Sequence, residues 1–64
     1  MFVVYWWYED YDKEIFCVTR EAADQVFEKY CHFAGTVRLY EGKNVKGVVT
    51  FDWDAPIRER KEED

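Results

Sequence analysis

The sequence predicts an α+β domain with the element order ββαββ, a four-stranded mixed sheet with one helix packed on one face. Residues 2–8 form an unbroken run of β-branched and aromatic side chains, which is typical of a buried strand. Residues 19–34 repeat their apolar side chains every three or four positions, the spacing of an amphipathic helix. Two alternating segments follow Gly35, and a chain of 64 residues has room for one core only.

The first two strands are predicted at residues 2–8 and 15–19, joined by the polar segment 9–14. Side chains of a strand alternate between its two faces. One face of this hairpin therefore carries Trp6, Tyr8, Ile15 and Cys17, and the other carries Tyr5, Trp7, Phe16 and Val18. Both faces are apolar, and the pattern leaves open which of them meets the helix.

The helix is marked at both ends. Thr19 is a residue type that caps free backbone N–H groups, and Gly35 adopts the left-handed conformation that ends helices. Between them the apolar stripe consists of Ala23, Val26, Phe27, Tyr30, Cys31 and Ala34.

The second hairpin is predicted from residues 36–41 and 45–53, with the loop at residues 42–44 and Asn44 at positive φ. Alignment of the apolar side chains pairs Val37 with Val49. Pro56 then breaks the strand pattern, and mostly charged residues follow. We therefore expect one domain at residues 1–53 and a flexible, solvated tail at residues 54–64.

This element order is similar to that of the immunoglobulin-binding domain of streptococcal protein G. In that domain the two terminal strands lie side by side and parallel in the centre of the sheet, which is why a mixed sheet is expected here. The resemblance rests on element order alone and implies nothing about function.

The aromatic content is the strongest functional signal, because the chain contains three Trp, five Tyr and five Phe. One helix covers only one face of a sheet, so an apolar face of the first strand should stay exposed and serve as an interface. The candidate binding residues are Tyr5, Trp6, Trp7, Tyr8, Arg38, Tyr40 and Lys46. The alternative is that the tail or the hairpin loop folds over this face within one molecule.

The charge pattern predicts an acidic surface. The formal net charge is −5, which disfavours nucleic acid as a partner and favours basic proteins. The acidic surface residues are Glu9, Asp10, Asp12 and Glu14. With Asp24 and Glu28 on the helix they suggest an acidic nucleic-acid mimic as one alternative. Their spacing resembles a calcium loop only superficially, because Ile15 stands where a glycine must turn.

Catalytic and cofactor motifs are not found in the sequence. The chain has no serine and no phosphate-binding loop, and Cys31 with His32 lacks the further ligands of a zinc site. We therefore expect no enzyme activity, no metal and no cofactor. Only two cysteines and no membrane-spanning run indicate a cytoplasmic setting, with a Cys17–Cys31 disulfide left open.

The sequence thus predicts a small acidic protein–protein interaction module. One such module would be an inhibitor of a host protein that a phage or a mobile element encodes. This suggestion rests on the small size, the negative charge and the lack of an enzymatic motif, and not on a motif match. The main alternative is a homodimeric structural or regulatory protein that uses the same aromatic face. A small-molecule or base-stacking platform on that face is a third hypothesis.

Overall fold

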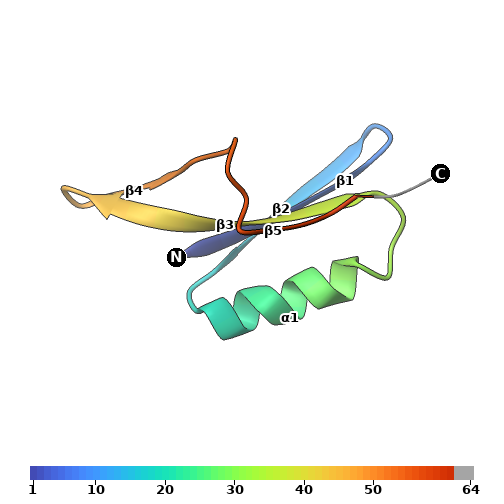
Figure 1. Ribbon diagram of the computed structural model, residues 1–64, viewed down its shortest axis with the longest axis horizontal. Helices are drawn as coiled ribbons and strands as arrows, with labels where there is room; N and C mark the ends of the chain where they lie inside the picture. Colours follow the sequence, from blue (N-terminus) through green and yellow to red (C-terminus); the bar gives the residue numbers. More distant parts are fainter. Residues whose placement is uncertain (62–64) are drawn as a thin grey trace.

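The computed structural model describes residues 1–61 as one helix on one face of a curled antiparallel sheet (Figure 1). The elements are β1 (Phe2–Tyr8), β2 (Tyr11–Cys17), α1 (Arg20–Tyr30), β3 (Thr36–Val45), β4 (Val48–Phe51) and β5 (Arg58–Arg60). The predicted α+β class and ββαββ order are confirmed, and a short fifth strand follows. The single helix within residues 1–61 is not long and apolar enough to cross a membrane.

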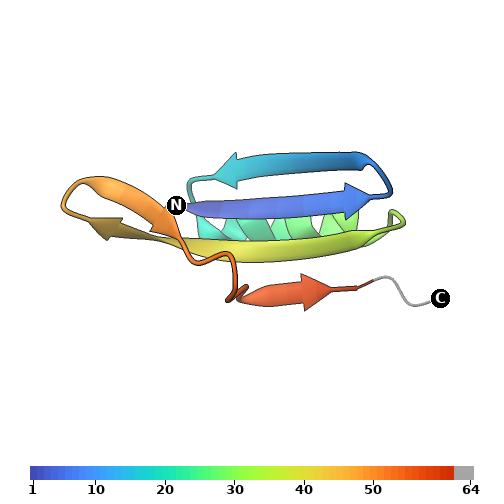
Figure 2. The same cartoon turned by 90° about the horizontal axis from the view of Figure 1, so that it is seen from above.

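The sheet is antiparallel in every described pair, so the expectation of a mixed sheet was wrong. β1 lies between β2 and β3, as Figure 2 shows from above. β3 pairs with β1 through residues 36–41, and with β4 through residues 42–45. Because β4 pairs only with the part of β3 that extends past β1, no parallel pair of β1 with β4 forms.

The β3–β4 turn lies further along the chain than predicted. Lys46 and Gly47 form a two-residue turn, with φ values of 51° and 85°. Two positive φ values match the twist of a tight hairpin, and the Asn44 side chain accepts a hydrogen bond from Gly47 N at 2.9 Å. Val49 consequently pairs with Asn44 instead of with Val37, and β3 runs straight through the predicted loop.

The first hairpin is also tighter than predicted. The turn comprises only Glu9 and Asp10, and β2 begins at Tyr11. The acidic residues after the turn therefore belong to the strand, with Asp12 opposite Trp7 and Glu14 opposite Tyr5. The predicted division of β1 and β2 into two faces is confirmed within the strands, although Val18 lies beyond β2.

The face of β1 with Phe2, Val4 and Trp6 meets α1, which resolves the choice that the sequence left open. Val4 is completely buried there, and the Trp6 indole Nε1 donates to the Ala34 carbonyl at 2.9 Å. The core on this side consists of Val4, Cys17, Ala23, Phe27, Tyr30, Val37 and Leu39. The predicted cap is confirmed, because the Thr19 hydroxyl accepts from Ala22 N at 3.1 Å.

The charged segment after Pro56 is not a solvated tail throughout. Arg58–Arg60 pairs with β3 as β5, and residues 62–64 of the predicted tail lie outside the described residues. Arg58 donates to Asp24 at 2.9 Å and to Glu28 at 2.6 Å, with its guanidinium 4.1 Å from the Phe27 ring centroid. These contacts to α1 keep β5 beside β3, although the sequence of this segment alone does not predict a strand.

Gly35 connects α1 to β3 at a position that excludes a side chain. Its φ is 110°, and a Cβ atom would lie 2.2 Å from the Trp7 carbonyl oxygen. Gly47 also has a positive φ, of 85°, but a Cβ atom there would meet nothing within 4 Å. A side chain at Gly47 would therefore cause backbone strain only, whereas a side chain at Gly35 would cause both backbone strain and steric overlap.

We expect Gly35→Ala to lower the free energy of unfolding by about 2–5 kcal/mol, because strain and overpacking add. Gly47→Ala, the matched control, should cost about 1 kcal/mol from backbone strain alone. Urea denaturation of both variants measures the difference. Equal losses would contradict the close approach of Gly35 to Trp7.

Candidate functional site

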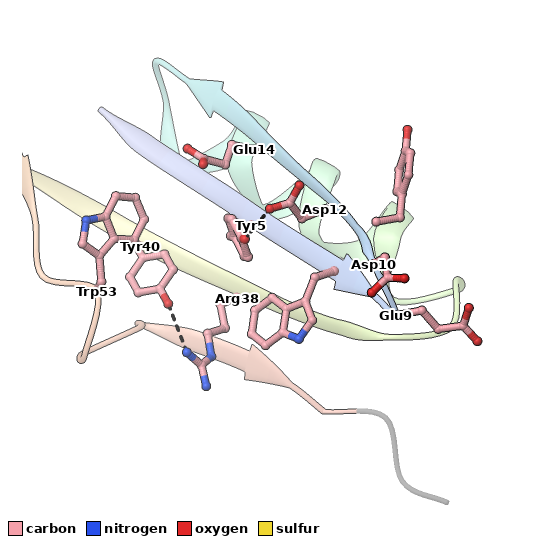
Figure 3. A pocket seen from close by; sticks show the side chains of 10 residues that line it. Tyr5, Glu9, Asp10, Asp12, Glu14, Arg38, Tyr40 and Trp53 are labelled. Atoms are coloured by element: carbon pink, nitrogen blue, oxygen red, sulfur yellow. Dashed lines mark hydrogen bonds between the residues drawn. The ribbon is translucent and has the colours of Figure 1, made fainter.

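The candidate site is a groove on the face of the sheet opposite α1, at the end where β1 turns into β2 (Figure 3). It has a volume of about 620 Å³ and is open rather than enclosed. Its lining consists of Tyr5, Trp7, Glu9, Asp10, Tyr11, Asp12, Glu14, Arg38, Tyr40 and Trp53. The residues come from β1, the β1–β2 turn, β2, β3 and the segment after β4.

The floor of the groove is aromatic because β1 alternates. Tyr5 and Trp7 lie on the same face of the strand, with their ring centroids 5.2 Å apart. Both side chains are only partly buried, since α1 covers the other face. They form a partly exposed aromatic surface on this side of the sheet.

Arg38 of β3 lies beside this floor, opposite Tyr5 in the strand pairing. Its guanidinium is 5.0 Å from the Trp7 ring centroid, and it donates to the Tyr40 hydroxyl at 3.4 Å. It also forms an ion pair with Glu59 of β5. The bonds to Tyr40 and Glu59 raise the pKa of Arg38 above its usual range. Arg38 is therefore a cation whose charge is already matched.

Four carboxylates line the groove without any further cation in its lining: Glu9, Asp10, Asp12 and Glu14. The Tyr5 hydroxyl donates to Asp12 Oδ2 at 2.8 Å, which fixes that carboxylate beside the aromatic floor. This hydrogen bond raises the pKa of Tyr5, and the nearby charge of Glu14 contributes further. The acidic surface predicted from the sequence thus coincides with one wall of the aromatic groove.

A second group of aromatic side chains covers the part of this face near the start of β1. The Trp53 ring centroid lies 4.9 Å from that of Tyr40 and 5.4 Å from that of Phe51, which in turn contacts Phe16. As a result Tyr40 is only 3% exposed, and Val3 of β1 is fully buried. The chain therefore covers the part of the apolar face near Val3 with Phe51 and Trp53, and not with the tail or the hairpin loop that the sequence alternative named. The part near Tyr5 and Trp7 stays partly exposed.

The structure brings together some of the predicted binding residues and separates others. Tyr5, Trp7, Arg38 and Tyr40 share the groove. Trp6 and Tyr8 lie on the face of β1 that looks toward α1, and Trp6 contacts the Tyr30 ring. Lys46 lies in the β3–β4 turn, away from the groove. Strand alternation separates Trp6 and Tyr8 from Tyr5 and Trp7, and the shifted turn removes Lys46.

Trp53 is a groove residue that the sequence analysis did not predict as a binding residue, because it placed Trp53 at the end of a final strand at residues 45–53, whereas β4 ends at Phe51. The signal was present, because Pro56 ends any strand soon after Trp53. The helix acids Asp24 and Glu28 do not join the acidic wall, because both pair with Arg58. Hydrogen bonding to Arg58 lowers the pKa of Asp24.

Residues 1–61 contain no cluster of three or more His, Cys, Asp or Glu side chains that could hold a metal ion. Both cysteines are free thiols. Comparison of the chain with protein-family models, curated proteins and solved structures finds no match. The geometry of the groove is therefore the basis for assigning a function.

We expect Asp12→Asn to lower the pKa of Tyr5 toward the usual value of 10.0, because the charged acceptor of its hydroxyl is lost. An alkaline titration followed by NMR of the tyrosine Cζ carbons measures this shift. Asp10→Asn serves as the control, because it removes an acid from the same groove but keeps the Tyr5–Asp12 bond. An unchanged Tyr5 pKa in Asp12→Asn would contradict the described wall.

Proposed function

We propose that the groove binds a basic segment of a partner protein, and that the chain works as an interaction module and not as an enzyme. The observation that carries this proposal is that partly exposed aromatic rings lie beside four carboxylates that form no ion pair with the one cation of the groove lining, Arg38. A Lys or Arg side chain combines an apolar stem with a charged head. Its stem would pack on Tyr5 and Trp7 while its head meets Asp12 or Glu14.

Arg38 supports this mode of binding from within the molecule. Its guanidinium contacts the Trp7 ring on one side and pairs with the Glu59 carboxylate on the other. A basic side chain of a partner would find the same combination in the Tyr5 ring and the Asp12 carboxylate. Such cation–π contacts contribute about 0.5–1 kcal/mol at exposed sites.

The overall charge favours the same class of partner. A net charge of −5 attracts basic proteins over a distance and repels nucleic acid. A nucleic-acid mimic is a narrower form of this proposal, because Arg58 already matches the helix acids Asp24 and Glu28. In this narrower form, the four acids of the groove lining would provide the negative charges that the partner binds.

The cellular setting that we propose is the reducing cytoplasm, which the free thiols of Cys17 and Cys31 support. In that setting the module would act by covering a basic surface of its partner. An inhibitor of a host protein and a regulatory subunit both work in this way.

Self-association is a second candidate, and the β3–β4 hairpin favours it. This hairpin extends beyond α1 and the β1–β2 hairpin (Figure 2) and carries the exposed side chains of Val45, Val48 and Val49. Lys43 and Lys46 lie on the same arm, so the arm of a second copy would offer basic groups to the groove. Light scattering over a range of concentrations separates the candidates, since a persistent monomer excludes this one.

The test of the groove is calorimetry with a capped peptide of alternating Lys and Thr. We expect Asp12→Asn/Glu14→Gln to weaken binding roughly tenfold or more, because each lost charge pair contributes about 1 kcal/mol. Trp7→Ala should weaken binding as well. The control is Glu21→Gln/Glu41→Gln, which makes the same change in net charge at exposed positions outside the groove lining.

An equal loss in both double variants would mean that the peptide responds to net charge and not to the groove. No binding of the peptide to the unmodified chain would also overturn the proposal.

A further inference from the structure

We infer that the basic segment binds as an additional β-strand on the free edge of β2. This inference rests on the proposed function of the groove and specifies the form of the ligand. The segment is extended and carries Lys or Arg at every second position. Its backbone pairs with β2, and its basic side chains enter the groove.

The first observation is that β2 is an edge strand. It pairs with β1 alone, and within residues 1–61 no strand lies on its other side (Figure 2). An edge strand presents a row of unpaired N–H and C=O groups, and extended peptides add to such edges. The edge is seven residues long, from Tyr11 to Cys17.

The second observation identifies the backbone groups that point outward. Gly42 N donates to the Met1 carbonyl at 2.8 Å, so the odd-numbered residues at the start of β1 direct their backbone groups toward β3. The even-numbered residues of β1 then bond to their partners on β2, which are odd-numbered. Alternation therefore leaves the N–H and C=O groups of Asp12, Glu14 and Phe16 directed toward the free edge.

The third observation is that the same residues face the groove side of the sheet. Glu14 lies opposite Tyr5, and Asp12 lies opposite Trp7. Phe16 lies on the same face and is 56% exposed. In an antiparallel pair, residues directly opposite each other share a face. A strand added to this edge with Lys or Arg at every second position therefore places basic residues opposite Asp12 and Glu14, and the apolar stem of the next basic side chain beside Phe16.

The charges on β2 also disfavour the simplest competing occupant, a second copy of β2. Antiparallel registers centred on residues 12–14 would place Asp12 or Glu14 opposite another acid, or Lys13 opposite itself. Charged residues on an edge strand are a common protection against pairing with itself. A basic strand avoids this repulsion.

The experiment uses the full chain labelled with ¹⁵N and two capped peptides of identical composition. One peptide alternates Lys with Thr and Val, and the other holds its Lys residues in one block. We expect the alternating peptide to slow hydrogen exchange at the amides of Asp12, Glu14 and Phe16 by about tenfold or more. The amides of Lys13 and Ile15 already bond to β1 and should change little.

A third peptide keeps the alternating sequence but is N-methylated at every second backbone amide, on the edge that would meet β2. We expect it to lose the protection at Asp12, Glu14 and Phe16. Its methyl groups replace the N–H donors to the β2 carbonyls and hold the peptide strand away from the edge, so its own carbonyls no longer accept from these amides.

The outcomes separate the two proposals. If the alternating and block peptides bind equally and none of the three amides is protected, strand addition is overturned and the groove proposal stands. If neither basic peptide binds, the proposed function fails and this inference fails with it.

Discussion

One helix covers one face of a sheet whose central strand is apolar on both faces, and the rest of the structure follows from this constraint. On the α1 side, Val4 of β1 is buried in the core and Trp6 packs against it. On the other side, Trp53 and its neighbours cover only the first half of the strand. Tyr5 and Trp7 remain partly exposed, and they form the floor of the groove.

Charge is distributed so that one group of acids is matched and another is not. The helix acids are held by Arg58, and Glu59 is held by Arg38, so these pairs fasten β5 to the domain. The acids of the β1–β2 hairpin have no such basic partner in the groove lining. The unpaired negative charge of the groove therefore lies beside the partly exposed aromatic rings, and this combination is the basis on which we propose a basic ligand.

Local features of the fold could be predicted from the sequence, and long-range pairings could not. The Thr19 cap and the alternation of Tyr5 with Trp6 depend on neighbouring residues, and both were confirmed. The pairing of β4 depends on the length of β3, which passes through an expected loop because Lys46 and Gly47 make the tighter turn. β4 therefore pairs with residues 42–45 of β3, and β1 lies beside β3 instead of beside β4. β5 was missed because its ion pairs with α1 are invisible to periodicity.

The most direct test of the account is the free energy of unfolding of Trp6→Ala and Trp7→Ala, measured by urea denaturation. Trp6 packs toward α1 and bonds to the Ala34 carbonyl, so its loss should cost about 3–5 kcal/mol. Trp7 lies on the open face, and its loss should cost about 1 kcal/mol from its contacts with Arg38 and Tyr5. Equal losses in the two variants would contradict the claim that α1 shelters only one face of β1.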